Sequence, residues 1–414
     1  MADSKNLFKT SLSILEELEK AGKKARLVGG CVRDRLQNLQ PKDYDIATEA
    51  LPREILAIFE KSPWKTVPTG IDHGTITVVT KFGPIEVTTL RKDLETDGRH
   101  AKVAFGTSFE EDAARRDFTI NAMSEDKNGQ VFDYYGGKED LKAKILKFVG
   151  EPRVRIKEDY LRILRFFRFW ARFQLIPDTK ALDAIKENAR NINSVSRERV
   201  TSEFLQTLDS DDCYLVLKGM ESCGVLSALF GDYLAPMDKE KAALFKELWA
   251  KERALVRFCG LLTPFKEEKE VKRLAEKWRL SREQSQLLKV FLVFTKDLPK
   301  SQDDTAAKMA FLDQIEKTAA TKRLEDLLAG MQWLCPQDKK MYESLLLLEA
   351  TKGAVRRAPP LLNGKEVARE TGLEGVLLGR ALKELVRSHR NGDISDAIEA
   401  RKFIKKYCLE KPKS

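Results

Sequence analysis

The chain has 414 residues, of which 42% are apolar and 33% are charged, and its formal net charge is +10. This length and composition predict a soluble, globular protein of roughly two to four domains. No run approaches the ~18 apolar residues of a membrane-spanning helix, so we expect no membrane segment. The excess of basic residues favours a polyanionic partner.

The cysteines and the first residues of the chain both indicate a cytoplasmic protein. The six cysteines are irregularly spaced and form no CxxC pair, which is typical of free thiols in a reducing cytosol. Within residues 1–20, Phe8, Leu12 and Leu15 repeat at helical spacing among charged residues. This segment is therefore predicted to be an amphipathic helix rather than a signal peptide.

Residues 1–150 alternate strand-like and helix-like segments, which predicts a small mixed sheet with helices packed against it. The expected strands cover residues 25–28, 43–47, 73–82 and 85–90. A short helix is expected from Cys31, and a second one over residues 52–61, with Pro52 at an allowed position in its first turn. We therefore expect an N-terminal head of the α+β class.

After residue 150, helical periodicity dominates, so the predicted fold is an α+β head followed by an all-α neck, body and tail. Helices are expected over residues 157–173, 240–261, 324–334 and 341–350. The basic, proline-containing stretch at residues 352–360 is predicted to be a linker. The expected domains are the head at residues 1–150, the neck at 151–208, the body at 209–350 and the tail at 351–414.

A glycine pair lies between a predicted strand and a predicted helix in the head. Because Gly29 and Gly30 carry no side chains, backbone N–H groups can approach a triphosphate closely, and Arg33 can contact a nucleotide. On the next predicted strand, a period of two places the carboxylates of Asp43 and Asp45 on one face. Singly, these features are typical of a turn and of a solvated strand end, but their short spacing favours a binding site.

A third carboxylate is available on a later predicted strand, at Glu86. Three converging carboxylates are what a pair of Mg²⁺ ions needs, so we expect Asp43, Asp45 and Glu86 to hold two Mg²⁺ ions. One ion would activate an attacking 3′-hydroxyl group, and the other would stabilise a leaving pyrophosphate. This chemistry is nucleotidyl transfer.

A second group of polar residues follows in the head. Asp117 and Asn121 are four residues apart, which places them on one face of a predicted helix, and they suit the two hydroxyls of a ribose. The neighbouring Arg116 suits a phosphate or a base edge. Taken alone, this segment is equally typical of the charged start of a surface helix.

The predicted neck helix carries acids followed by bases. Glu158 and Asp159 lie four and three residues before Arg162, a spacing that usually gives surface ion pairs only. A stripe of arginines continues along the helix, at Arg162, Arg165, Arg168 and Arg172. Like charges on one face repel unless an anion or carboxylates lie opposite, and a rigid carboxylate and guanidinium can read a nucleobase by paired hydrogen bonds.

These segments resemble the class II tRNA nucleotidyltransferases, the CCA-adding enzymes of the polymerase-β-like superfamily. The resemblance covers residues 25–203, with the family's motifs in their order. They are LVGGCVRD with DYDIAT, RRDFTINAM, DYYGGKEDL (residues 133–141), EDYLRILRFFRF and ERVTSE (residues 198–203). The resemblance implies a protein that adds C, C and A to the 3′ end of tRNA from CTP and ATP and releases pyrophosphate.

The resemblance also implies a role for each candidate residue. The metal ligands would be Asp43, Asp45 and Glu86. The contacts to the incoming nucleotide would be Gly29, Gly30, Arg33 and Arg116. The ribose would be checked by Asp117 and Asn121. The Watson–Crick edge of the base would be read by Glu158, Asp159 and Arg162, with Arg165 and Arg168 supporting the pocket.

Three alternatives stay open. Bacterial poly(A) polymerases share these motifs, but they resemble one another in a basic and aromatic stretch where this chain has TGIDHGTITVV, at residues 69–79. Enzymes that add only CC are expected to lack the family's flexible loop, whose position residues 91–105 fill here. A non-catalytic RNA-binding protein would not need the intact carboxylates.

Further expectations concern partners and added domains. The histidines, at positions 73, 100 and 389, form no His-Asp dipeptide, so we do not expect the phosphohydrolase domain that some family members carry. Residues 361–386 are predicted to form a helix–turn–helix, which is typical either of a tRNA-binding tail or of a simple helical packing module. We expect tRNA as the partner, and a monomer or a weak dimer.

Overall fold

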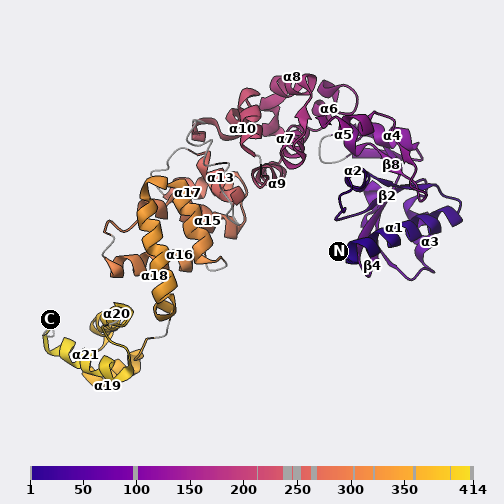
Figure 1. Ribbon diagram of the computed structural model, residues 1–414. Coiled ribbons are helices and arrows are strands. Elements are labelled where there is room, and N and C mark those ends of the chain that lie inside the picture. Colours follow the sequence, from indigo (N-terminus) through magenta and orange to yellow (C-terminus); the bar gives the residue numbers. More distant parts are fainter. Residues whose placement is uncertain are drawn as a thin grey trace. The chain divides into compact units, whose positions relative to one another are not determined.

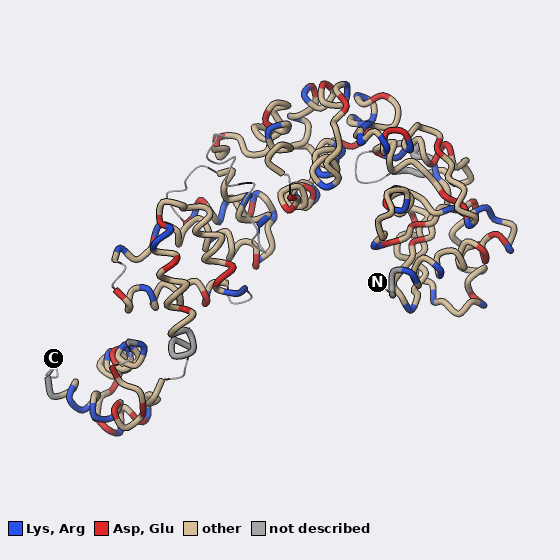
Figure 2. Tube along the Cα trace, in the orientation of Figure 1, with Lys and Arg blue, Asp and Glu red and all other residues tan. Residues whose placement is uncertain are grey.

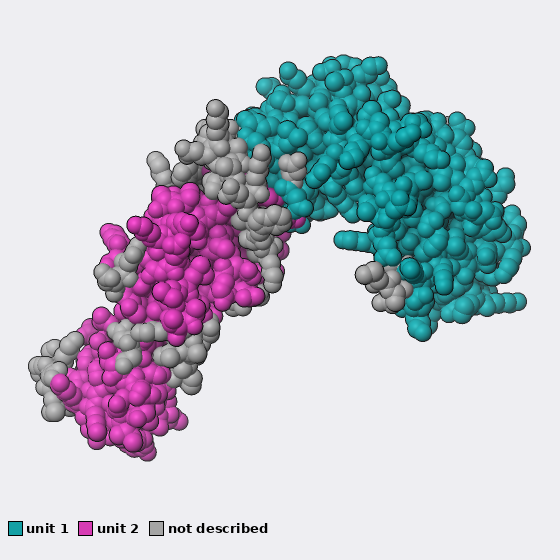
Figure 3. Space-filling model, in the orientation of Figure 1, with its two compact units in different colours: residues 1–234 teal, residues 235–414 magenta. Residues whose placement is uncertain are grey.

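The structure of the protein is a computed structural model in which two compact units are seen, Met1–Leu234 and Ala235–Ser414 (Figure 3). It describes residues 2–96, 101–211, 213–235, 245, 253–262, 268–301, 304–319, 322–357, 360–391 and 393–410. The first unit contains the sheet and the helices that follow it. The described part of the second unit is helical.

A seven-stranded mixed sheet forms the head, with strand order β3-β4-β5-β2-β1-β8-β9. The strands are β1 Ala25–Val28, β2 Asp45–Thr48, β3 Lys65–Gly70, β4 Thr75–Thr80, β5 Gly83–Thr89, β8 Ser124–Glu125 and β9 Val131–Phe132. Strands β2 and β5 pair in parallel, and this register places Asp45 opposite Glu86. The other neighbours pair antiparallel. The predicted α+β head with a mixed sheet is confirmed.

Helices accompany the sheet in the head (Figure 1), among them α1 Ala2–Lys20, α2 Gly30–Leu36, α3 Pro52–Phe59 and α4 Phe109–Ala114. Helix α1 buries Ile14, Leu15 and Leu18 completely and packs against α3 and β1. The amphipathic N-terminal helix is therefore confirmed. Its Phe8 ring lies 5.7 Å from the ring of Tyr44, the residue between the two predicted metal-binding aspartates.

The strands differ from the prediction in two main respects: β2 begins later than expected, and β3 is an additional strand. Strand β2 begins at Asp45, so Asp43 precedes the strand, and the argument that the pleat of one strand holds both carboxylates is wrong. Strand β3 was not predicted because its sequence, KTVPTG, is mostly exposed and lacks a regular alternation. Its Pro68 is tolerated because β3 is an edge strand of the sheet.

The segment predicted as a flexible loop, residues 91–105, contains an antiparallel strand pair instead. Strand β6 is Arg91–Thr96 and strand β7 is Ala101–Phe105, whereas residues 97–100 lie outside the described residues. The Phe105 ring packs against Gly74, where a Cβ atom would come within 2.6 Å of the ring. The base of this hairpin therefore rests on the head.

After α5 (Gly137–Lys142), the chain forms two helices over the segment where one was predicted. Helix α6 is Pro152–Glu158 and α7 is Leu161–Phe173, so the single helix expected over residues 157–173 is wrong. The break falls at Asp159, whose backbone is extended and whose carboxylate accepts a hydrogen bond from the N–H of Leu161 at 3.0 Å. Aspartate side chains compete with the helix in this way.

An aromatic core joins the head to the neck. The Phe118 ring of the head lies 5.1 Å from that of Phe148 and 5.0 Å from that of Phe169 on α7. The unit continues with two-stranded β10 Ile145–Leu146 and β11 Ile176–Pro177, and with the helices α8 Thr179–Asn188, η3 Ala189–Ser194, α9 Arg197–Leu208, α10 Cys213–Ser222, α11 Val225–Phe230 and η4 Gly231–Tyr233. Trp170 of α7 packs against Gly219 of α10, where a Cβ atom would lie 2.5 Å from the indole.

The described helices of the second unit are α13 Arg253–Gly260, α14 Glu268–Lys277, α15 Arg282–Leu292, α16 Thr305–Thr318, α17 Leu324–Leu334, α18 Lys339–Arg357, α19 Gly364–Thr371, α20 Gly375–Asn391 and α21 Ala397–Glu410. Helix α17 matches its prediction. Helix α18 contains the predicted helix 341–350 and continues to Arg357, so the linker predicted from residue 352 is wrong in that part. Most of residues 240–252, in the first part of another predicted helix, lie outside the described residues.

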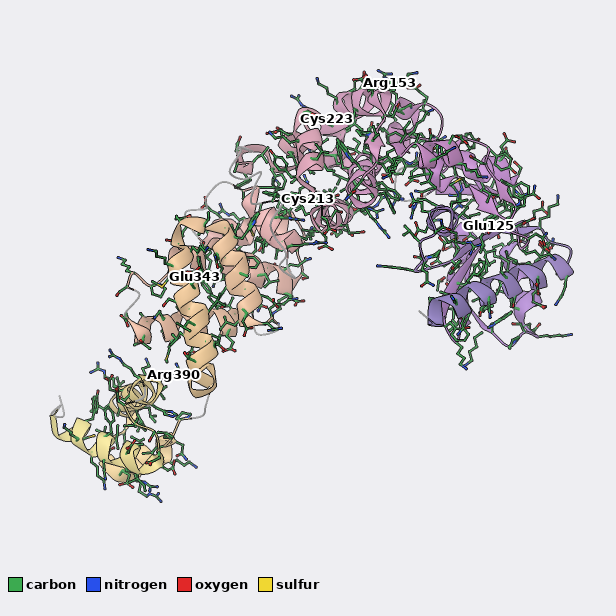
Figure 4. All side chains as sticks on the ribbon, in the orientation of Figure 1. Glu125, Arg153, Cys213, Cys223, Glu343 and Arg390 are labelled. Atoms are coloured by element: carbon green, nitrogen blue, oxygen red, sulfur yellow. The ribbon has the colours of Figure 1, made fainter. Side chains whose placement is uncertain are left out.

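Three further observations complete the fold. Lysine and arginine alternate with aspartate and glutamate along both units rather than forming one block (Figure 2). Arg390 of α20 (Figure 4) pairs with Asp313 of α16 and so ties the tail helices to the body.

Among the described helices none is by itself long and apolar enough to cross a membrane, although the bent pair Cys213–Ser222 and Val225–Tyr233 together meets the criteria of length and composition.

Helix α5 packs so closely on the head that we predict a large effect of one methyl group. A Cβ atom at Gly137 would lie 2.1 Å from the carbonyl oxygen of Thr119, which belongs to a backbone segment and cannot turn away. Gly137→Ala should therefore lower the free energy of unfolding by about 3 kcal/mol or more. Gly379→Ala, in open space on helix α20, should instead raise it by about 0.5–1 kcal/mol. Urea denaturation measures both, and an equal effect of the two variants would contradict the assigned contact.

Candidate active site

A cavity of about 670 Å³ lies in the first unit, between the head and the neck helix α7. All predicted site residues line it except Glu86, Glu158 and Arg168. The structure also adds cavity residues that the sequence reasoning missed or gave no role: Asp34, Lys42, Arg115, Leu161, Phe169, Arg172 and Arg199. Some of these lay within reach of the motifs, because Lys42 precedes Asp43 and Arg172 belongs to the arginine stripe.

The glycine turn forms one wall of the cavity. Gly29 has a φ of 75°, in the left-handed region that favours glycine, and α2 begins at the next residue. A Cβ atom at Gly29 would also lie 2.8 Å from a guanidinium nitrogen of Arg116. Glycine at this position therefore allows both the turn and the close approach of a cation.

Two carboxylates lie next to this turn. Asp43 and Asp45 both line the cavity, and Glu86 lies opposite Asp45 on the adjacent strand β5. Removal from bulk water and the negative charges of Asp43 and Glu86 raise the pKa of Asp45 to about 6. The charges of Asp43 and Glu86 thus reach Asp45 and disfavour its ionisation.

A divalent cation fits this donor set chemically, because it would remove the repulsion between the carboxylates, and oxygen is the ligand that Mg²⁺ prefers. As they stand, however, no three Asp, Glu, His or Cys side chains in the described part of the chain are grouped closely enough to hold a metal ion. Side-chain rotation of Asp43 or Glu86 would have to complete the group.

The backbone that carries Asp43 and Asp45 is anchored by the buried side chain of Tyr44, which lies between them in the sequence. Tyr44 is buried, with 3% of its surface exposed, and contacts Phe8 of α1. The same Phe8 ring carries the guanidinium of Arg35 at 3.8 Å. Arg35 in turn donates two hydrogen bonds of 2.9 Å to the buried carboxylate of Glu125, which is labelled in Figure 4. This cluster links α1, α2 and β8 to the residue that precedes β2.

Asp117 lies at the centre of a buried hydrogen-bond network. Its Oδ1 accepts from the N–H of Phe118 at 2.8 Å and from Nδ2 of Asn121 at 3.1 Å, and its Oδ2 accepts from Nη2 of Arg165 at 2.6 Å. Burial raises the pKa of this carboxyl, but the Arg165 charge and these hydrogen bonds outweigh it and lower the pKa below its ordinary value. Arg33 donates to Oδ1 of Asn121 at 2.6 Å.

The prediction that Asp117 and Asn121 share a helix face is wrong. Helix α4 ends at Ala114, Phe118 is extended, and Asn121 ends the short 3₁₀ turn η2, Thr119–Asn121. The two side chains still meet, because the turn brings Asn121 back over Asp117. The predicted contact between Asp117 and Asn121 is therefore present, but a short 3₁₀ turn forms it instead of the predicted α-helix.

Arg162 of α7 is held on three sides. Its Nη1 donates to the carbonyl oxygen of Arg155 at 2.8 Å and pairs with Glu158, and its Nη2 donates to the carbonyl oxygen of Arg115 at 3.1 Å. Glu158 therefore orients Arg162 and does not itself line the cavity. Asp159 lines the cavity and accepts from Nη2 of Arg199 on α9 at 2.6 Å.

Glu203 of α9 holds the next two arginines of the stripe. It accepts from Nε of Arg168 at 2.6 Å, and its other oxygen lies 3.5 Å from Nη1 of Arg165. Arg168 therefore does not line the cavity but faces α9. A chain of charges runs from Asp117 of the head through Arg165 to Glu203 of the neck, so the position of the cavity wall depends on both parts.

The comparisons with known proteins support a nucleotidyltransferase. Residues 25–147 match the family model described as "Poly A polymerase head domain", and residues 172–236 match "Probable RNA and SrmB- binding site of polymerase A". With the mixed sheet and its glycine turn and carboxylates, these matches define the chain as a nucleotidyltransferase of the poly(A) polymerase head type.

Similar proteins and solved structures show which family of nucleotidyltransferases this is. The chain is 34% identical to the CCA tRNA nucleotidyltransferase 1, mitochondrial, of Danio rerio, over 92% of this chain and 86% of that protein. It is 31% identical to a CCA-adding enzyme of Limosilactobacillus reuteri, over 94% of each chain. The solved structure of the Bacillus stearothermophilus CCA-adding enzyme in complex with CTP matches with a TM-score of 0.75 and 28% identity, covering 97% of this chain and 99% of that one. The chain belongs to the CCA-adding enzyme family, and the resemblance found in the sequence is confirmed.

The ion pair between Asp117 and Arg165 yields a prediction on stability. Asp117→Asn leaves the half-buried Arg165 without its main partner and should lower the free energy of unfolding by about 2–3 kcal/mol near neutral pH. Because the pKa of Asp117 is lowered in the folded state, this contribution is present above about pH 4 and is lost as the pH falls through the folded-state pKa. Urea unfolding of both proteins should therefore show a difference that shrinks in acid.

A matched control is the exposed pair of Glu187 with Arg153, which is labelled in Figure 4. Glu187→Gln removes a carboxylate from an arginine in the same way, but in water, where such pairs contribute little. It should leave unfolding nearly unchanged. A difference for Asp117→Asn that is independent of pH would contradict the role of its charge.

Proposed function

We propose that the protein adds C, C and A in turn to the 3′ end of tRNA, using CTP and ATP and releasing pyrophosphate. One observation carries this proposal: carboxylates on β2 and beside it, a glycine turn and a row of arginines border a single cavity, in a chain that is related along more than nine-tenths of its length to CCA-adding enzymes. A nucleoside triphosphate needs such a combination of cations and carboxylates.

The family generally uses divalent metal ions, and the finer assignment is two Mg²⁺ ions held by Asp43, Asp45 and Glu86. The parallel register of β2 and β5 supports it, because it places Glu86 opposite Asp45. Bound ions would supply Lewis acidity for the attacking hydroxyl and the leaving pyrophosphate. The residues of the chain hold the reactants in line, Gly29 and Gly30 by leaving room for the phosphates and Arg116 by its charge.

Base selection is assigned to the start of α7. Asp159 and Arg162 line the cavity and are each held by another side chain, Asp159 by Arg199 and Arg162 by Glu158. A fixed carboxylate and a fixed guanidinium present acceptors and donors in a set pattern, which a nucleobase can match only with the correct edge. The protein would therefore take the place of a template strand.

Ribose recognition is assigned to the Asp117 and Asn121 pair, which lines the same cavity. Arg165 and Arg33 fix these two side chains from opposite sides. Arg168, held by Glu203 behind the cavity wall, supports the arrangement without touching the nucleotide.

The further proposals concern the setting of the reaction. The partner is the acceptor end of tRNA, with the helical neck (151–208), body (209–350) and tail (351–414) contacting the rest of it beside the head (1–150). We also propose a cytoplasmic monomer or weak dimer without a phosphohydrolase domain. The vertebrate relatives are named as mitochondrial, so the location within a cell is tested separately by fractionation.

The decisive experiment gives the protein labelled CTP, ATP, GTP or UTP with Mg²⁺ and a tRNA that lacks CCA, with an oligo(A) primer alongside. We expect two C and one A on the tRNA, followed by a stop. Termination after CC would favour a CC-adding enzyme, long A tails would favour a poly(A) polymerase, and no incorporation would favour a non-catalytic RNA-binding protein.

The same assay tests the metal carboxylates. Asp45→Asn should reduce incorporation on the order of 10³-fold, because a lost Lewis-acid contact costs several kcal/mol in the transition state. The control is Glu49→Gln, an exposed carboxylate just after β2 that pairs only loosely with Lys24, at 3.9 Å. Equal activity of the two variants would rule out the metal assignment.

Base selection has its own test at Arg162. Arg162→Lys keeps the charge but removes the planar fork, so UTP incorporation relative to CTP should rise by roughly 10- to 100-fold. Arg190→Lys, on the exposed surface of the neck, is the control and should leave the ratio unchanged. If Arg162→Lys lowers the rates for both nucleotides and keeps their ratio, Arg162 does not select the base.

A further inference from the structure

The last arginine of the α7 stripe differs from the other three. Arg162, Arg165 and Arg168 each pair with a carboxylate, namely Glu158, Asp117 and Glu203. Arg172, one turn further along, lines the cavity and is exposed, and it has no carboxylate partner among the described residues. No carboxylate in the described part of the chain therefore pairs with its charge.

A second arginine lies nearby. The guanidinium of Arg33 lies 4.2 Å from the centre of the Phe173 ring, and that of Arg172 lies 5.0 Å from the same ring. Arg33 is already bound to Asp34 at 2.6 Å and to Asn121. Burial lowers the pKa of Arg33, and the positive charge of Arg172 lowers it further although Asp34 opposes both. The two cations repel each other, and an anion between them would remove that repulsion.

The position of Arg172 along the helix indicates which anion this is. Arg162 and Arg172 are ten residues apart on α7, or ~15 Å along its axis. Arg162 lies at the end assigned to the base, whereas Arg172 lies beside Arg33, which follows the glycine turn. A nucleotide whose base is read at the first end directs its phosphates toward the second.

We propose that Arg172 binds the terminal phosphates of the incoming nucleoside triphosphate, and the pyrophosphate that leaves, as a contact additional to Arg33 and Arg116. This inference rests on the proposed function, because it assumes that the base lies at Arg162. A cation in the last turn of a helix also favours the helix itself, so the test must separate ligand binding from stability.

The experiment compares ligands that differ only in their phosphates. Binding of CTP and of CMP to the wild-type protein and to Arg172→Gln is measured by calorimetry, and melting temperatures are recorded for both. We expect Arg172→Gln to weaken CTP binding on the order of tenfold and to leave CMP binding unchanged. Pyrophosphate should also inhibit the variant less, and KM should rise for CTP and ATP but not for tRNA.

Two further proteins complete the test. Arg172→Lys keeps the charge and should lie between the wild type and Arg172→Gln, and it replaces the glutamine variant if that one does not fold. Arg190→Gln removes an exposed neck arginine outside the cavity and should match the wild type. Equal losses for CTP and CMP, a change in the KM for tRNA alone, or no change would each overturn the proposal. A wild-type protein that adds no nucleotide would instead refute the proposed function.

Discussion

The structure depends on the ion pair between Asp117 of the head and Arg165 of the neck. Asp117 is buried and accepts four hydrogen bonds, two of them from Arg165, so its charge is stable only while Arg165 faces it. Arg165 also approaches Glu203 on α9, and the aromatic core around Phe118 packs beside this pair. A shift of α7 against the sheet would therefore separate a buried charge from its partner, which is costly. The ion pair therefore holds α7 against the head.

The cavity follows from the same balance of charge. Most of its guanidinium groups are neutralised by a carboxylate of the protein, which fixes them in place. Two kinds of charged group in the cavity have no ion-pair partner among the described residues. The carboxylates are Asp43, just before β2, and Asp45, its first residue. The cations are Lys42 and Arg172. Carboxylates without a paired cation and cations without a paired carboxylate, both in one cavity, match a metal-bound triphosphate, which carries both signs of charge.

The sequence predicted most of the residues that line the cavity, but it predicted the local backbone around several of them incorrectly. Glycine, carboxylate and arginine patterns located the cavity residues because their chemistry is local. The break at Asp159 and the short turn at Asn121 were not predictable from spacing, since a residue four positions on can be reached by a helix or by a tight turn. Glu158 and Arg168 carried the right residue types, but only three-dimensional contacts with Arg162 and Glu203 show that they face away from the cavity. The edge strand β3 was not predicted, because its mostly exposed residues show no alternation of apolar and polar side chains.

The parallel pairing of β2 with β5 has a consequence for folding. Asp45 and Glu86 are neighbours across the two strands but are separated along the chain by α3, β3 and β4. Contacts between distant parts of a chain form more slowly than local ones, because the loop between them must first close. We therefore expect the pairing of β2 with β5, which brings the two carboxylates together, to form more slowly than a local helix such as α7. A chain in which β2 and β5 have not paired would therefore lack the arrangement of carboxylates on which the proposed metal site depends.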